Sequence, residues 1–176
     1  MAKKSQPIDH LKKLILKEMT NNYPSFPPSY IPINDFSQIK NKERRELLRI
    51  EKFINLFGNG KANIIANTGT RRDTRKVNTC AMGSKRMIGS VQYTKSQMQN
   101  GIADIKSSVF GLTVDFELKR IYKNGRDRQS DEQKKYEEQL KGAGGLYKIV
   151  HSFEHFYEIY LPLHKEINVK MNGLFS

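Results

Sequence analysis

Two acidic residues and one lysine have the spacing that a metal site on a β-hairpin needs. Residues 101–119 read G-I-A-D-I-K-S-S-V-F-G-L-T-V-D-F-E-L-K, and this alternation predicts two antiparallel strands joined by a tight turn at residues 110–111. Residues that face each other in such a pair share one side of the sheet. In this register Asp104 faces Glu117, and Lys119 lies two residues further along on the same side.

The same register separates the polar from the apolar side chains of the hairpin. One side carries Asp104, Lys106, Ser108, Thr113, Asp115, Glu117 and Lys119, and the other carries Ala103, Ile105, Val109, Leu112, Val114, Phe116 and Leu118, with Ser107 as the exception. A slip of one residue would move the side chains of a strand to the opposite side. The pattern therefore predicts the register as well as the strands.

The polar side has the groups needed to hydrolyse a phosphodiester. Facing Cβ atoms are roughly 4.5–5.5 Å apart, and two carboxylates at that distance repel unless a cation or a shared proton compensates them. Mg²⁺ binds one or two protein carboxylates and keeps water and phosphate oxygens as its other ligands. An ammonium group nearby can stabilise charge on a phosphate. The alternative is a hairpin whose charged side is solvated.

Five short motifs follow one another along the chain. They are G-I-A-D at 101–104, D-F-E-L-K at 115–119, G-R at 125–126 with S-D-E-Q at 130–133, A-G-G at 143–145 and V-H-S-F-E at 150–154. Over about residues 43–160 their order resembles the VRR-NUC (virus-type replication and repair nuclease) domain of the PD-(D/E)xK nuclease superfamily. The resemblance implies an α/β fold with a restriction-endonuclease-like core, in which helices flank a mixed β-sheet with a central antiparallel hairpin.

The resemblance also assigns roles to individual residues. Asp104 and Glu117 would be metal ligands together with the backbone carbonyl of Leu118, and Lys119 would be the catalytic lysine. The metal would be Mg²⁺, with Mn²⁺ as a substitute, and no other cofactor is implied. Ala103 stands where family members often have proline. Because it falls on the apolar side, we expect the chemistry to be unaffected.

A glutamate of the helix predicted over residues 41–57 would join the catalytic group, because the resemblance places one near the metal. Glu43 and Glu46 both fall on the apolar stripe of this helix. We favour Glu46. A position at the surface of the domain is the alternative for its side chain.

Two roles compete for Gln133. The sequence Ser130-Asp131-Glu132-Gln133 fits a capping box at the start of a helix, with serine as the N-cap and glutamine at the third helical position. The resemblance instead places this glutamine near the catalytic lysine and the attacked phosphate. We do not expect one side chain to do both at once, and we favour the active-site role.

The charge of the chain indicates a nucleic-acid partner. Its 176 residues include 31 Lys and Arg against 18 Asp and Glu, a formal net charge of +13. Such an excess is expected of a protein that binds the DNA backbone, although anionic membranes and acidic proteins attract the same charge. We predict DNA contacts from Arg71, Arg72, Arg75, Lys76, Lys95, Arg126 and Arg128.

Cysteine usage and hydropathy point to the interior of a cell. Cys80 is the only cysteine, so the chain has no internal disulfide. The first residues form no apolar leader, and no apolar run approaches membrane-spanning length. We expect an intracellular, cytoplasmic protein without a membrane partner, in the cytoplasm of the host if the chain is viral.

The pattern divides the chain into an extension and a domain. Residues 1–40 would form a helix over 8–20 and a proline-rich strap, and residues 41–176 the nuclease-like domain. Short strands are predicted at 61–66, 86–93 and 146–150, with the segment 77–100 the weakest in signal. Helices are predicted from Ser130 to Gly142 and from Ser152 to Pro162, where proline should end the last one.

One rival motif is excluded by its setting. Residues 151–155 read H-S-F-E-H and match the zinc-peptidase pattern H-x-x-E-H. That pattern requires both histidines on one helical face, whereas His151 is predicted at the end of a strand and Ser152 at the helix cap.

We therefore expect a Mg²⁺-dependent endonuclease that acts on branched DNA during replication, recombination or repair, in the manner of a Holliday-junction resolvase, and that works as a homodimer. Two alternatives remain. The first is a module on the same fold that binds nucleic acid without cutting it, and the second is a restriction-like nuclease that selects a short sequence.

Overall fold

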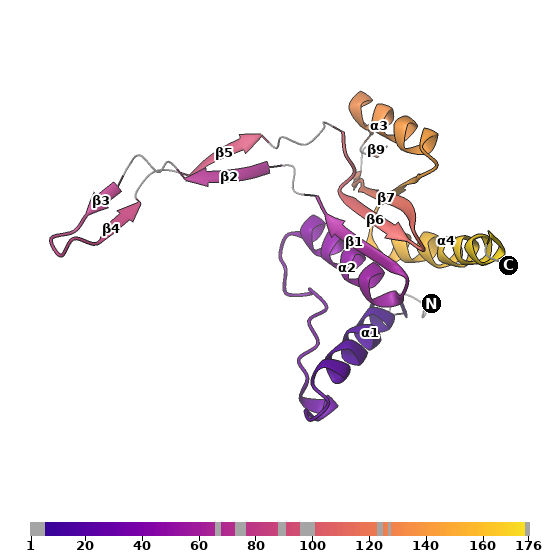
Figure 1. Cartoon of the computed structure of the whole chain (residues 1–176), viewed down its shortest axis with the longest axis horizontal. Coiled ribbons are helices and arrows are strands. Elements are labelled where there is room, and N and C mark those ends of the chain that lie inside the picture. The colour runs from indigo at the N-terminus through magenta and orange to yellow at the C-terminus, as the bar shows by residue number, and fades with distance from the viewer. Residues whose placement is uncertain are drawn as a thin grey trace. The chain divides into compact units, whose positions relative to one another are not determined.

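The chain divides into two compact units. The computed structural model describes residues 6–65, 68–72, 77–87, 91–95, 101–122, 125–126 and 128–174. Unit 1 consists of Met1–Ile65 and Gly101–Ser176, and unit 2 of Ala66–Asn100 (Figure 1). Residues 1–40, which the sequence sets apart as an extension, thus belong to unit 1.

A four-stranded mixed sheet forms the centre of unit 1. Its strands are β1 (Gly60–Ile64), β6 (Ile105–Val109), β7 (Leu112–Leu118) and β10 (Leu146–Val150), in the spatial order β1-β6-β7-β10. β6 runs antiparallel to β1 and to β7, whereas β10 is parallel to β7. The predicted α/β fold, with a mixed sheet and an antiparallel hairpin at its centre, is confirmed.

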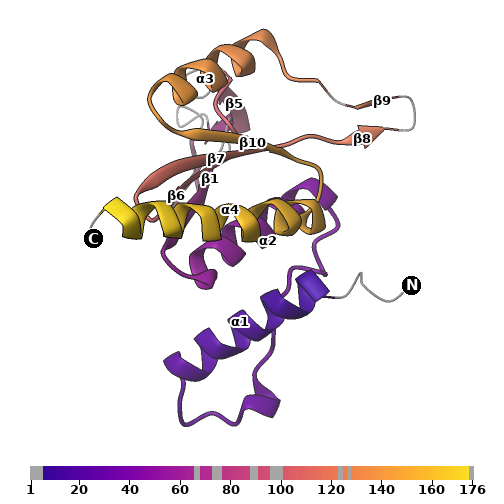
Figure 2. The ribbon, with the colours of Figure 1, turned by 90° about the vertical axis from the view of Figure 1, so that its right-hand side faces the viewer.

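Helices cover both faces of this sheet. The helices are α1 (Gln6–Asn22), the short 3₁₀ helix η1 (Pro28–Tyr30), α2 (Lys42–Phe57), α3 (Asp131–Gly142) and α4 (Phe153–Leu174). α3 lies on one face, and α2 and α4 lie on the other (Figure 2). α1 packs against α2 and α4. A small hairpin of β8 (Ile121–Tyr122) and β9 (Gly125–Arg126) follows β7.

The β6–β7 hairpin has the predicted register. Phe110 and Gly111 form its turn with φ angles of 49° and 82°, which suits a two-residue turn that needs positive φ at both positions. Beyond the turn, Val109 pairs with Leu112 and Ile105 pairs with Phe116. Asp104 immediately precedes β6, so the alternation of the strand brings it to the side of Glu117.

The main hydrophobic core lies between the sheet and the helices α2 and α4. Its fully buried side chains include Ile50, Phe53, Ile105, Val109, Val114, Phe116, Phe153, Phe156 and Tyr160, and α1 adds Leu11 and Ile15. A smaller cluster contains Ile102, Ala103, Tyr136 and Tyr147. The prediction that Ala103 shares the side of Ile105 is wrong, because Ala103 precedes β6 and packs in the smaller cluster instead.

Helix α4 is longer than predicted. The sequence places its end at Pro162, but the helix continues to Leu174 with Pro162 inside. The turns after the proline present Leu163 and Ile167 to the main core, where both are buried. Packing of these two side chains offsets the loss of one N–H donor at the proline.

Unit 2 is built from antiparallel strand pairs. β2 (Thr68–Arg72) pairs with β5 (Val91–Lys95), and β3 (Val77–Thr79) pairs with β4 (Lys85–Met87). The basic segment that starts at residue 70 therefore begins in strand β2. The sequence did not predict this strand, because apolar residues do not alternate there. Its pairing partner lies far along the chain, beyond the reach of a local pattern.

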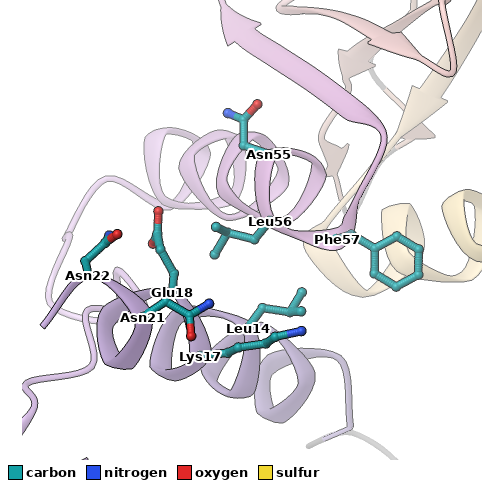
Figure 3. Close-up of a pocket in the computed structure, with 8 residues that line it drawn as sticks. All are labelled: Leu14, Lys17, Glu18, Asn21, Asn22, Asn55, Leu56 and Phe57. Carbon is teal, nitrogen blue, oxygen red and sulfur yellow. The ribbon is translucent and has the colours of Figure 1, made fainter. Parts of the chain in front are cut away.

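A groove of about 310 Å³ separates α1 from α2 (Figure 3). Glu18 of α1 forms an ion pair with Lys52 of α2 at 2.5 Å, and Leu14 and Leu56 pack against the main core. None of the predicted site residues lines this groove. Among the residues that the structure describes, no helix has the length and apolar character to cross a membrane.

Truncation of Phe53 tests the aromatic core. This ring is fully buried and packs edge-on against Phe153, Phe156 and Tyr160. Replacing it with alanine should lower the free energy of unfolding by about 3–5 kcal/mol, measured by urea denaturation. The control is Tyr30→Ala, because Tyr30 is 74% exposed and its loss should change stability by about 0.5 kcal/mol or less. Equal losses for the two variants would contradict the assignment of the core.

Candidate active site

The hairpin brings Asp104, Glu117 and Lys119 together on the α3 side of the sheet. The Nζ atom of Lys119 is 3.2 Å from Oε1 of Glu117, and these residues are 8% and 2% exposed. The backbone N–H of Asp104 donates to Oε2 of Glu117 at 3.3 Å. In return, Oδ2 of Asp104 accepts the backbone N–H of Leu118 at 2.9 Å. Each carboxylate thus accepts a backbone N–H from the opposite arm of the hairpin.

The two carboxylates influence each other electrostatically. Burial raises the pKa of Glu117, and the negative charge of Asp104 raises it further, while Lys119 acts in the opposite direction. A cation between the carboxylates would relieve this repulsion. This repulsion between Asp104 and Glu117 makes the site a candidate metal centre.

The donor set fits a hard divalent cation such as Mg²⁺ or Mn²⁺. Within the described part of the chain, no group of three or more His, Cys, Asp and Glu side chains could hold a metal ion. Mg²⁺ does not need such a group, because one or two carboxylates with water and phosphate oxygens complete its shell. Asp104 and Glu117 meet that requirement. A role for the Leu118 carbonyl stays a prediction.

Gln133 serves the helix and the site at the same time. Its backbone N–H donates to Oγ of Ser130 at 3.3 Å, and its Oε1 accepts the N–H of Ser130 at 3.0 Å, so the capping box is complete. The same Oε1 accepts from Nζ of Lys119 at 2.9 Å, and Nε2 donates to Oε1 of Glu117. The expectation that one side chain would not both cap the helix and lie at Lys119 is wrong, while a role of Gln133 in catalysis stays a prediction. An amide oxygen has two lone pairs and its nitrogen two hydrogens, so the roles do not compete.

A second hydrogen bond joins α3 to β7 below the site. The hydroxyl of Tyr136 donates to Oδ2 of Asp115 at 2.5 Å, and Asp115 is fully buried. Burial raises the pKa of Asp115, and burial with the Asp115 carboxylate raises the pKa of Tyr136. Sequence reasoning did not identify Tyr136, although it lies one helical turn after Gln133 and therefore on the same face of α3.

Gly101 lets the start of the hairpin approach α3 closely. Its φ is 83°, and a Cβ atom added there would lie 2.4 Å from the carbonyl carbon and oxygen of Glu132. Because these atoms belong to the first turn of α3, a side chain at position 101 would push that turn away from the sheet. Gln133 follows in the same turn.

Glu46 is buried, but it bonds elsewhere. Its Oε2 accepts the backbone N–H of Phe153 at 2.7 Å, and its Oε1 lies 3.4 Å from nitrogens of Arg45 and Arg49. These bonds tie α2 to the first turn of α4, and none of them reaches Asp104 or Glu117. Glu43, the second choice, forms an exposed ion pair with Arg120. A catalytic role for either glutamate stays a prediction.

The predicted DNA contacts fall into three groups. Arg71 and Arg72 lie in β2 and Lys95 in β5, where Lys95 pairs with Thr68. Arg126 lies in β9, and Arg128 is exposed. Arg75 and Lys76 lie outside the described residues. The role of all seven in DNA binding stays a prediction.

Comparison with known proteins gives no independent guide to this site. No family model, curated protein or solved structure matches the chain.

Gly101 and Gly111 have nearly the same positive φ angle, but only Gly101 lies against α3. Alanine substitutions at the two positions therefore distinguish the cost of the close contact from the cost of the backbone conformation. Gly111 has a φ of 82°, but an added Cβ would meet nothing within 4 Å. Gly111→Ala should cost about 1–2 kcal/mol, the penalty of left-handed backbone. Gly101→Ala should lower the free energy of unfolding by more than this, because the first turn of α3 must also move. Equal losses in urea denaturation would show that α3 does not pack closely on Gly101.

Proposed function

We propose that this chain is a Mg²⁺-dependent DNA endonuclease built on a PD-(D/E)xK-like core. The observation that carries the proposal is the buried pair of Glu117 and Lys119, 3.2 Å apart, with Asp104 close enough for its charge to raise the pKa of Glu117. A buried carboxylate beside a second one is costly in a purely structural role. It is expected where a divalent cation binds during function.

Each residue of the site has a distinct role in this proposal. Asp104 and Glu117, with the carbonyl of Leu118, would hold Mg²⁺, which when bound polarises a phosphate oxygen and acidifies a water molecule. Lys119 directs its ammonium group to the charge that develops on the phosphate. Gln133 holds that ammonium group in place through its Oε1 atom, at 2.9 Å. The enclosure of Glu117 and Lys119 by α3 limits the access of bulk water, which strengthens these interactions.

The distribution of positive charge supports DNA as the substrate. Residues 66–100 contain Arg71, Arg72, Arg75, Lys76, Lys85, Arg86 and Lys95, and their only acidic residue is Asp73. A two-stranded antiparallel ribbon fits the major groove of B-DNA, and unit 2 contains such strand pairs. We assign to this basic ribbon the contacts with the DNA backbone. Action on branched DNA as a homodimer, with one site for each strand, completes the proposal.

Removal of the lysine separates cleavage from binding. Lys119→Ala should slow cleavage of a four-way junction in Mg²⁺ by about 10²-fold or more, the usual cost of losing one group that stabilises transition-state charge. Binding of the same junction in EDTA should change little, because only one ammonium group among many basic residues is removed. Lys61→Ala is the control, since Lys61 is an exposed lysine of the same sheet.

Flaps and linear duplex in the same assay test the structural preference, and Mn²⁺ in place of Mg²⁺ tests the cofactor. Full activity of Lys119→Ala would exclude the proposed role of the lysine. No cleavage of any substrate by the unaltered chain in Mg²⁺ or Mn²⁺ would favour a binding module.

Removal of positive charge from residues 71–76 tests whether unit 2 contacts the DNA backbone. Replacing Arg71, Arg72, Arg75 and Lys76 with glutamine should weaken DNA binding and reduce its dependence on salt. The slope of log K against log salt should fall by about 0.9 for every phosphate that the variant no longer neutralises. A matched control removes four lysines that are exposed on unit 1, Lys134, Lys141, Lys165 and Lys170. If both sets weaken binding equally, the ribbon has no special role.

A further inference from the structure

A cavity of about 690 Å³ lies in unit 1 where the first turns of α2 and α4 meet the end of β7. Figure 2 shows these two helices on the face of the sheet opposite α3. The cavity is lined by Lys42, Arg120, Ile121, His151, Ser152 and His155, among others. Its volume is within the range of sites that hold small organic ligands, about 300–1,000 Å³. No residue of the proposed hydrolytic reaction other than Leu118 and Glu46 lines it.

Charge at this cavity favours an anion. Its two acidic residues are already compensated, because Glu43 pairs with Arg120 and Glu46 pairs with Arg49 and accepts the N–H of Phe153. Lys42 adds a positive charge to the lining without a further acid to oppose it. A phosphate group is the anion that suits an enzyme acting on DNA.

Two stacked histidine rings are part of the cavity lining. The rings of His151 and His155 are 11° from parallel with centroids 5.0 Å apart. Nδ1 of His151 lies 2.8 Å from the carbonyl oxygen of Lys119. Because a carbonyl only accepts, this nitrogen carries the proton and the ring is held in a fixed orientation. Histidine rings are among the surfaces on which proteins stack unpaired bases.

The cavity adjoins the candidate active site through the backbone. Leu118 lines the cavity and donates its N–H to Asp104, and His151 is bonded to the carbonyl of Lys119. Both places lie at the end of β7, so a DNA strand that passes from the carboxylate pair around this edge of the sheet would bring a neighbouring nucleotide to the cavity. Ile121, which is 63% exposed, offers an apolar contact at this place.

We infer that this cavity is a pocket for one unpaired nucleotide of the substrate strand, with its base on the histidine pair and its phosphate near Lys42. The inference rests on the proposed function and extends it to the class of substrate. A base must leave the duplex stack to enter a pocket, and this costs least where the DNA is branched or single-stranded. The pocket thus gives a physical reason for a preference for branched DNA.

The chain contains its own controls for a test by NMR. It has four histidines, and two of them lie away from the pocket, since His10 contacts Tyr157 and His164 contacts the carbonyl of Gly58. The full chain is titrated in EDTA, where cleavage is prevented, with a single-stranded thymidine tetranucleotide. The imidazole signals of His151 and His155 should shift and those of His10 and His164 should not. A blunt linear duplex should shift neither pair.

Two substitutions at one position test the stacking. His155→Ala should weaken binding of the tetranucleotide about tenfold, which lies within the range expected for removal of one aromatic ring that stacks on a base. His155→Phe keeps a ring and should retain most of the affinity. Unchanged His151 and His155 signals at saturation, or equal shifts with the linear duplex, would overturn the inference. Because no step requires cleavage, these results are distinguishable from a failure of the proposed nuclease activity.

Discussion

A carboxylate and an ammonium group lie almost fully buried beside each other on one face of the sheet, and the fold has to satisfy both. Removing ionised groups from water costs several kcal/mol each unless good pairing and hydrogen bonds compensate. Glu117 accepts from the N–H of Asp104, the amide of Gln133 and the ammonium of Lys119. The first turn of α3 supplies that amide, so the placement of α3 is the condition on which the site depends.

The sheet separates an apolar core on one face from a cluster of buried acids on the other. On the side of α2 and α4, aromatic rings around Phe53 form the apolar core, and the buried Glu46 of α2 bonds the first turn of α4. On the side of α3, the hydrogen bonds of Gln133 and Tyr136 hold a helix over buried acids. The parallel pairing of β10 with β7 connects the two, because it brings His151 to the carbonyl of Lys119.

The sequence predicts what depends on local alternation and misses what depends on distant partners. The register of the β6–β7 hairpin could be predicted because a period of two separates polar from apolar side chains along both strands. The double role of Gln133 could not, since it requires α3 to lie over Lys119. The predicted helix end at Pro162 was wrong for a similar reason, because burial of Ile167 against the core keeps the helix intact beyond the proline. Strand β2 was missed because its partner β5 is distant in the chain.

The central claim is that the carboxylates of Asp104 and Glu117 share one divalent cation, and anomalous diffraction from a crystal grown with Mn²⁺ tests it most directly. One anomalous peak should lie between the two carboxylates, at direct coordination distance from an oxygen atom of each. Lys119 and Gln133 should keep their hydrogen bond in that crystal. A peak at another place, or two carboxylates that point away from each other with no peak between them, would contradict the account.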